Sequence, residues 1–327
     1  MSNQSSVSRW QAMEAAPEDS GAIRALFEKV FKHEMSISHW NWKYEHQRGE
    51  GVVVKSGDEV VAFYGAVKRR VVCRGEPTNT LQCVDTMVDT SQRGSLSKKG
   101  PYYLAATTFL KKYIGYNKPY LFGFGFPNAR VMKLGEILSV QADIGAVVEV
   151  EWKPKAADQL VGSEIRLSAP EHTQLIDSLW QRMVSDLADR IVIIRDLDYL
   201  LYRYNENPSH DYQVYLVGSL NEVKGLIVCR VEIDRLLILD LLGPLANYPL
   251  LIEFAQDLAA RKGLTAVSTW ITEPDTVLFQ TGDSSMNEEV LIKDIGVRIP
   301  TSVCAPGPSP DSLHNAWFLL AGDTDFL

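Results

Sequence analysis

The residues with the clearest chemical potential lie in a basic segment of an otherwise acidic chain. The 327-residue sequence has a net charge of −8, yet residues 90–135 contain no Asp or Glu. The basic residues of this segment are Arg93, Lys98, Lys99, Lys111, Lys112, Lys118, Arg130 and Lys133. A local cluster of positive charge in an acidic protein indicates one specific anionic ligand. The alternative is a solvated helix face on which basic residues gather by chance.

A strand, a basic loop and a helix follow one another in this segment. Residues 81–88 (LQCVDTMV) have the apolar character of a strand, and Pro101 suits the first turn of the helix after the loop. The loop contains Arg93, Gly94, Lys98, Lys99 and Gly100. The first N–H groups of a helix are unpaired and carry the positive end of its dipole, so the pattern predicts a phosphate or pyrophosphate site.

The strand before the loop also carries candidate catalytic residues. Asp85 and Met87 are two positions apart, so their side chains should share one face of the sheet, and Cys83 should share that face too. Asp85 is the candidate general base, acting directly or through a water; the alternative is a hydrogen-bonded structural carboxylate. Cys83 has no evident histidine partner in the sequence, which disfavours a nucleophilic role.

Self-similarity indicates that the chain consists of two related halves. The triplet Ala-Pro-Glu at 16–18 is followed by the apolar spacing of an amphipathic helix, and both recur 153 positions later, from residue 169. A helical pattern that ends in glycine at 110–115 returns at 258–263. Each half reads helix, three strands, helix, strand, helix or loop, strand.

An aromatic motif repeats in the same order. Residues 42–44 (WKY) return as residues 202–204 (YRY), and in both copies a glycine follows the tyrosine after 21 positions, at Gly65 and Gly225. Strand and turn signals lie between the tyrosine and the glycine. With Trp40, the first motif either lines an acceptor site or packs in the core, and the repetition favours packing.

Length and element order predict an α+β protein of two tandem domains, 1–155 and 156–327, each with a mixed, mostly antiparallel sheet flanked by helices. The N-terminus lacks the basic start and apolar run of a signal peptide, so we expect a cytoplasmic protein. The cysteines are far apart and form no C-x-x-C pair, which predicts neither disulfides nor a metal site. The net acidic charge disfavours binding to nucleic acid or to an anionic membrane.

These features resemble the GCN5-related N-acetyltransferase (GNAT) family. Val88, followed after four residues by Arg93-Gly94 and then by a glycine that opens an aromatic-containing helix, resembles the acyl-CoA loop of that family. Residues 126–128, followed by Leu134-Gly135, resemble the family segment in which an asparagine begins the cofactor-side helix. The resemblance covers most of residues 15–150 and, more loosely, the second half, as in tandem GNAT proteins.

The resemblance implies an N-acyltransferase in which a small-molecule or peptide amine attacks the thioester of acetyl-CoA directly, without a metal. The cofactor-binding residues that it implies are Met87, Val88, Arg93, Gly94, Lys98, Lys99, Gly100 and Asn128. In the second half, residues 240–250 lack a basic residue at the equivalent place, and Glu253 and Asp257 follow. Because acidic residues near a helix start repel phosphate, the second half resembles a degenerate GNAT domain.

Several features leave alternatives open. The loop is longer than the family pattern, and the family's acid tyrosine is not evident after Asn128, where Met132 and Lys133 stand. Asn128 either caps the following helix or faces CoA. Residues 315–320 predict a last apolar strand. The tail from Asp323 to Leu327 either frays or, as the resemblance to tandem GNAT proteins of the enhanced-intracellular-survival type implies, brings a C-terminal carboxylate to the active site. A noncatalytic acyl-CoA sensor and an unrelated duplicated α+β interaction protein remain as alternative functions.

Overall fold

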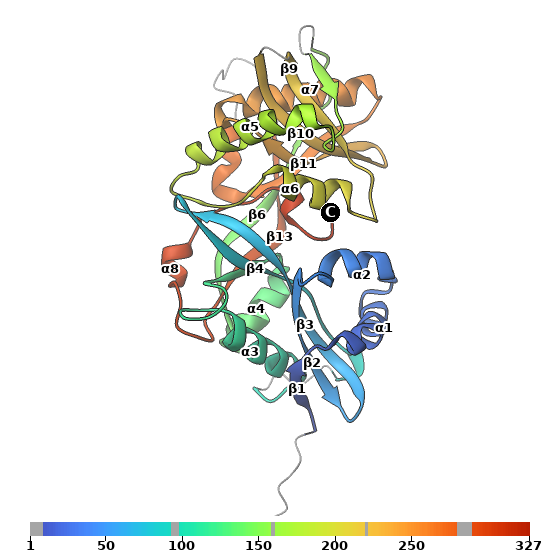
Figure 1. Cartoon of the computed structure of the whole chain (residues 1–327), viewed down its shortest axis with the longest axis vertical. Helices are drawn as coiled ribbons and strands as arrows, with labels where there is room; N and C mark the ends of the chain where they lie inside the picture. Colours follow the sequence, from blue (N-terminus) through green and yellow to red (C-terminus); the bar gives the residue numbers. More distant parts are fainter. Residues whose placement is uncertain (1–8, 93–97, 158–160, 220–221, 280–289) are drawn as a thin grey trace, which may run out of the picture. The chain divides into compact units, whose positions relative to one another are not determined.

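The computed structural model describes residues 9–92, 98–157, 161–219, 222–279 and 290–327. By their internal contacts the residues group into two compact units. Figure 1 shows the chain, coloured along the sequence. The first unit comprises residues 1–69, 79–143 and 300–312, and the second comprises residues 70–78, 144–299 and 313–327. Each unit thus takes in a segment from the other half of the sequence, and the domain limits at residue 155 stay a prediction.

The first half of the chain alternates helices with strands. Its elements are β1 (Gln11–Glu14), α1 (Ser20–Phe31), α2 (Ile37–Tyr44), β2 (Gly49–Ser56), β3 (Glu59–Cys73), β4 (Glu76–Val88), α3 (Pro101–Tyr113), β5 (Gly123–Gly125), α4 (Ala129–Ile137) and β6 (Gln141–Trp152). The strands follow the order β1-β2-β3-β4-β5, with β1, β2 and β3 antiparallel and β5 parallel to β4. The predicted α+β class is confirmed.

Helices cover both faces of this sheet (Figure 1). On one face, α1 buries Ile23, Leu26 and Phe27 in a cluster that includes Met87 of β4. On the other face, α3 packs its Phe109 and neighbouring residues against the sheet. The apolar spacing that predicted α1 therefore marks the buried stripe of the helix, as expected for an amphipathic helix at the edge of a core.

The second half repeats this arrangement. Its elements are β7 (Gly162–Glu164), α5 (Thr173–Asp186), β8 (Ile191–Ile193), α6 (Leu197–Leu200), β9 (Gln213–Ser219), β10 (Glu222–Glu232), β11 (Arg235–Leu242), α7 (Tyr248–Arg261), β12 (Ala266–Thr272), β13 (Leu291–Ser302), α8 (Pro310–Leu313) and β14 (Trp317–Phe318). A π-helical turn (Leu201–Asn205) extends α6, and 3-10 turns include η7 (Ala321–Asp323). None of the described helices is both long and apolar enough to span a membrane.

The second sheet has the order β13-β6-β12-β11-β10-β9-β7. As in the first copy, an antiparallel pair, β10 and β11, leads to a helix and then to a strand, β12, that is parallel to β11. Within the second unit, residues 71–73 at the end of β3 pair with β8, and β8 pairs in parallel with β14. The predicted pair of related α+β copies is therefore confirmed by the topology.

Candidate functional site

The carboxyl end of β4 extends beyond its parallel neighbour. β4 and β5 pair from Leu81 with Gly123 to Cys83 with Gly125, and β4 then continues to Val88. Gly125 permits this close pairing, because a Cβ there would lie 2.9 Å from the carbonyl oxygen of Cys83. Ligands of sheets with parallel strands commonly bind beyond the carboxyl ends of those strands.

The loop after β4 begins at an anchored residue. The N–H of Asp89 donates to the carbonyl of Val61 at 2.8 Å, and its buried carboxylate accepts the N–H of Ser91 at 2.8 Å and forms an ion pair with Lys29. Burial acts to raise the pKa of Asp89, but the hydrogen bonds from Lys29 and Ser91 outweigh it and leave the pKa below its usual value. The start of the basic loop is therefore held by α1 and β3.

The loop ends at the start of α3. Gly100 is buried in an extended conformation immediately before the helix, and Pro101 occupies its first turn, as predicted. Lys98 and Lys99, which precede it, are exposed. The N-cap residue is Gly100, which has no side chain to accept a hydrogen bond, so the first N–H groups of α3 point beyond the helix end together with the positive end of the dipole. Arg93 and Gly94 lie outside the described residues.

An irregularity in β4 separates Asp85 from Cys83. Asp85 has a φ of 51°, a left-handed conformation that shifts the alternation of side chains along the strand. Leu81 and Cys83 pack in the cluster beneath α3, whereas Met87 packs with α1 on the opposite face. The expectation that Cys83 shares a face with Asp85 is therefore wrong, because regular alternation stops between them.

Asp85 lies on the face covered by α2, where two consecutive residues hold its carboxylate. The Tyr44 hydroxyl donates to Oδ2 at 2.6 Å, and Lys43 Nζ lies 2.9 Å from Oδ1 and 2.7 Å from Oδ2. Lys43 is 2% exposed and the Asp85 side chain is 8% exposed. Trp40 stacks on Tyr44 with ring centroids 4.3 Å apart, because four positions separate them on one helix face.

The other predicted site residues lie at the end of β4 and at the start of α4. The side chain of Val88 packs in the cluster beneath α3, opposite to Met87. Asn128 is exposed and caps α4, since its side chain accepts the N–H of Val131 at 3.0 Å. The capping alternative for Asn128 is thus observed. Burial raises the pKa of the Cys83 thiol to about 11, which suits a core residue rather than a nucleophile.

Known proteins share the fold of most of the chain but show no match to its sequence. No protein-family model matches the chain, and no curated protein matches its sequence. A probable N-acyltransferase from Enterococcus faecalis V583 superposes with a TM-score of 0.67 at 11% identity, over 90% of this chain and 72% of that chain. A GCN5-related N-acetyltransferase from Anabaena variabilis superposes with a TM-score of 0.64 at 14% identity, over 90% and 73%. This chain has the GNAT fold.

A more distant neighbour shares the same fold. N-myristoyltransferase from Saccharomyces cerevisiae, solved with bound myristoyl-CoA, superposes with a TM-score of 0.53 at 10% identity, over 93% of this chain and 86% of that chain. At such identities the similarity establishes the GNAT fold, as the sequence motifs implied. Within the described residues, no group of three or more His, Cys, Asp or Glu is placed to hold a metal ion.

The second GNAT copy has the same strand arrangement, but its own C-terminal segment occupies the end of the strands. β11 and β12 pair only as far as Leu237 with Ser268. Beyond that point Leu320 bridges to Ile271 of β12, and a Cβ on Gly322 would lie 2.8 Å from the carbonyl oxygen of Leu239 in β11. The C-terminal segment, residues 319–324, therefore lies against both strands where they diverge.

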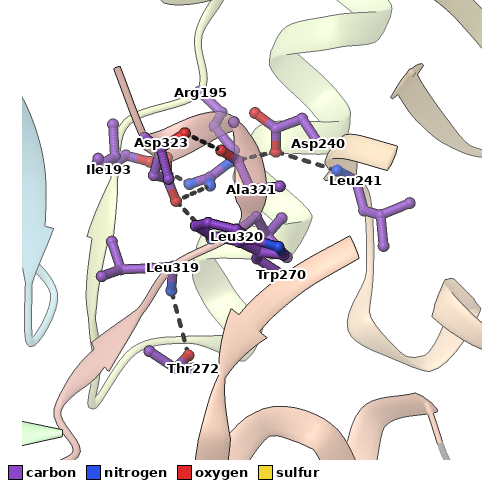
Figure 2. A network of polar contacts seen from close by, with 12 residues as sticks. Ile193, Arg195, Asp240, Leu241, Trp270, Thr272, Leu319, Leu320, Ala321 and Asp323 are labelled. Atoms are coloured by element: carbon purple, nitrogen blue, oxygen red, sulfur yellow. Dashed lines mark hydrogen bonds and ion pairs between the residues drawn. The ribbon is translucent and has the colours of Figure 1, made fainter. Parts of the chain in front are cut away.

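A buried ion network secures this segment, as Figure 2 shows. Arg195 donates to Asp240 of β11 and to Asp323 of the C-terminal segment, each at 2.7 Å, and all three side chains are 0% exposed. Burial raises the pKa of Asp240, although Arg195 opposes that rise. The expected frayed tail from Asp323 is wrong, because Arg203 also binds the carbonyls of Gly322 and Leu327.

Sequence reasoning missed the residues that hold the two carboxylates. The repetition of the aromatic motif favours core packing for Tyr44 and gives no role to Lys43, and the partner of both residues lies about 40 positions away in the chain. The repeat contained a usable signal: Tyr204 of the second motif donates to Asp240 at 2.9 Å, just as Tyr44 donates to Asp85. Pairing each repeated tyrosine with the aspartate of the third strand after it would have predicted both contacts.

Proposed function

We propose that the chain is an acyl-CoA-dependent N-acyltransferase that transfers an acetyl group from acetyl-CoA to a primary amine by direct attack. The observation that carries this proposal is the end of β4, which passes the last pair with β5 and leads through a basic loop to Gly100 at the start of α3. A thioester beside the strand and a pyrophosphate at the helix start match these two chemical environments.

The residues divide into two groups in this proposal. Lys98, Lys99 and the N–H groups at the start of α3 after Gly100 would hold the pyrophosphate, with Arg93 and Gly94 from the part of the loop that is not described. Backbone groups at Met87 and Val88 would contact the thioester carbonyl. Asn128 would contact CoA while it caps α4. Acetyl-CoA supplies an acyl group activated as a thioester, so holding both substrates together provides much of the rate.

The role of Asp85 as general base stays a prediction. Its carboxylate already accepts hydrogen bonds from Tyr44 and Lys43, so proton transfer from an amine requires a path through one of these partners or a water. The acceptor that we propose is a small-molecule or peptide amine. The net charge of −8 attracts cations, and a protonated amine is a cation, so the charge favours an amine as the acceptor.

A noncatalytic acyl-CoA sensor is the second candidate, because the same site serves binding without transfer. The two functions differ in turnover: an enzyme releases CoA from acetyl-CoA in the presence of a suitable amine, whereas a sensor does not. A panel of aminosugars, polyamines and peptides with free N-termini, assayed for released CoA thiol, separates them.

The cofactor site is tested by charge reversal at the helix start. Lys98→Glu combined with Lys99→Glu should weaken acetyl-CoA binding about fourfold or more, because each exposed charge contact contributes roughly 0.2–1 kcal/mol and reversal doubles the loss. Lys118→Glu is the matched control, since this exposed lysine lies past the opposite end of α3, about 20 Å along the helix. Isothermal titration calorimetry measures both.

Two results would contradict the proposal. One is the absence of any rise in melting temperature of the unaltered protein with millimolar acetyl-CoA, CoA or longer acyl-CoAs, because a ligand at a hundred times its Kd stabilises the folded state by about 2.7 kcal/mol. The other is equal weakening by the loop variant and by Lys118→Glu, which would remove the binding site from the start of α3.

A further inference from the structure

The contact between α2 and β4 recurs in the second GNAT copy. Tyr204 donates to Asp240 at 2.9 Å, as Tyr44 donates to Asp85 at 2.6 Å. Both aspartates sit at an irregularity of their strand: Asp85 has a positive φ, and the pairing of β10 with β11 shifts register just before Asp240. The second copy keeps this contact although its own C-terminal segment fills the end of the strands. The contact therefore accompanies the strand irregularity rather than a bound substrate.

We propose that Tyr44 and Lys43 are positioning residues that fix the irregularity of β4 through Asp85, and so aim the backbone N–H groups beyond Asp85 at the thioester carbonyl. This inference rests on the proposed function. A positive φ is unfavourable for a residue with a Cβ and persists where the surroundings hold it. Here two donors from one helix hold both carboxylate oxygens, and α2 thereby sets the direction of the strand end.

The packing around Tyr44 restricts it to one position. A Cβ on Gly65 would overlap the Tyr44 hydroxyl, and a Cβ on Gly49 would overlap its ring. In the first copy, the glycine 21 positions after the tyrosine therefore makes room for the tyrosine hydroxyl; the glycine at this spacing in the second copy does not. In the second copy Gly322 makes room for the Tyr204 hydroxyl, whereas a Cβ on Gly225 would meet Leu251. Both copies thus give the hydroxyl a glycine neighbour, by different routes.

The same geometry argues against Asp85 as the base. Both of its oxygens accept hydrogen bonds, and its side chain is 8% exposed. An amine would have to displace Tyr44 or Lys43 to reach it. A positioning role requires the carboxylate to stay bonded to α2, whereas a base must release a partner to take the proton.

Tyr44→Phe tests the positioning role without any acceptor. The substitution removes the hydroxyl that holds Asp85, so the affinity for acetyl-CoA should fall about two- to tenfold, the range expected for one lost hydrogen bond. The affinity for CoA, which lacks the thioester carbonyl, should not change. Tyr204→Phe is the matched control from the second copy and should change neither affinity. Isothermal titration calorimetry gives both constants, below the melting temperature of each variant.

A second variant separates positioning from proton transfer. Lys43→Met combined with Asp85→Asn removes both buried charges together and keeps an oxygen for the Tyr44 hydroxyl. With the best amine from the panel, kcat/KM should fall about two- to tenfold, the loss expected from weaker positioning, and its pH profile should not change. A fall of about 10²- to 10⁴-fold with loss of the acidic limb would make Asp85 the base and overturn the proposal.

The outcomes also distinguish this proposal from the proposed function. An unaltered protein that binds neither acetyl-CoA nor CoA removes the acyltransferase and the carbonyl contact together. An unaltered protein that binds both, combined with a Tyr44→Phe variant that binds acetyl-CoA equally well or loses both ligands equally, removes only the positioning role.

Discussion

Removal of the Asp323 carboxylate should destabilise the second unit strongly. The residue is buried and accepts from Arg195 at 2.7 Å and from the N–H of Leu320 at 2.8 Å. Asp323→Ala leaves Arg195 with Asp240 as its remaining carboxylate partner in the network and leaves the backbone N–H without its acceptor. Both groups are then buried without full compensation, which is the costly way to break an ion pair.

The expected loss follows from these contacts. Breaking a buried pair by removing one partner costs about 3–5 kcal/mol, and the persisting contact with Asp240 places the loss toward the lower value. The orphaned N–H of Leu320 adds about 1 kcal/mol or more. We expect a total loss of about 4 kcal/mol in the free energy of unfolding, a large share of the roughly 5–15 kcal/mol that stabilises a typical domain. Asp323→Asn, which keeps the shape, should lose less.

Urea unfolding followed by circular dichroism measures this loss. The matched control is Asp177→Ala, which removes an exposed carboxylate from the middle of α5 in the same unit and should stay within about 0.5 kcal/mol of the unaltered protein. A loss below about 1 kcal/mol for Asp323→Ala, or one equal to that of the control, would refute the view that the C-terminal segment is secured by the ion network.

Two further predictions concern titrating groups. Cys83, with its pKa raised to about 11, should react with iodoacetamide at pH 8 far more slowly than a free thiol, because about one thiol in a thousand is ionised at that pH. Rapid alkylation of Cys83, identified by mass spectrometry, would contradict the raised pKa. Asp89 has a lowered pKa in the folded state, so its contribution to stability is present above the ordinary aspartate pKa of about 3.9 and is lost as the pH falls through the lower folded value. Urea midpoints should therefore decrease below about pH 4, and Lys29→Met should reduce that decrease; a pH dependence unchanged by Lys29→Met would exclude the Lys29 pair as its source.

The sequence by itself determined the elements whose information is local. The apolar spacing from residue 23 predicted the buried stripe of α1, and Pro101 marked the first turn of α3. The repeated patterns predicted two related α+β copies, which the topology confirms. Helical periodicity and turn chemistry act over a few residues, so they can be read along the chain without knowledge of distant partners.

The tertiary structure alone decided which residues meet at the candidate site. The left-handed conformation of Asp85 moves it to the face opposite Cys83, and a single φ value leaves no trace in the alternation of residue types. The partners of Asp85 come from α2, about 40 positions earlier in the chain, because a helix docks on a sheet as a unit and brings its whole inner face to residues that sequence spacing does not relate to it.

The fate of the C-terminus was equally invisible to local reasoning. Residues from Asp323 onward are polar enough to predict a frayed tail, yet Asp323 is buried because Arg195, 128 positions earlier, already lies beside Asp240. Arg195 is buried, and its charge is better compensated by two carboxylates than by one, so the fold is more stable with Asp323 beside it. Arg195 follows β8 and Asp240 lies in β11, so their ion pair forms only in the folded chain, and the tertiary structure alone decides where Asp323 lies.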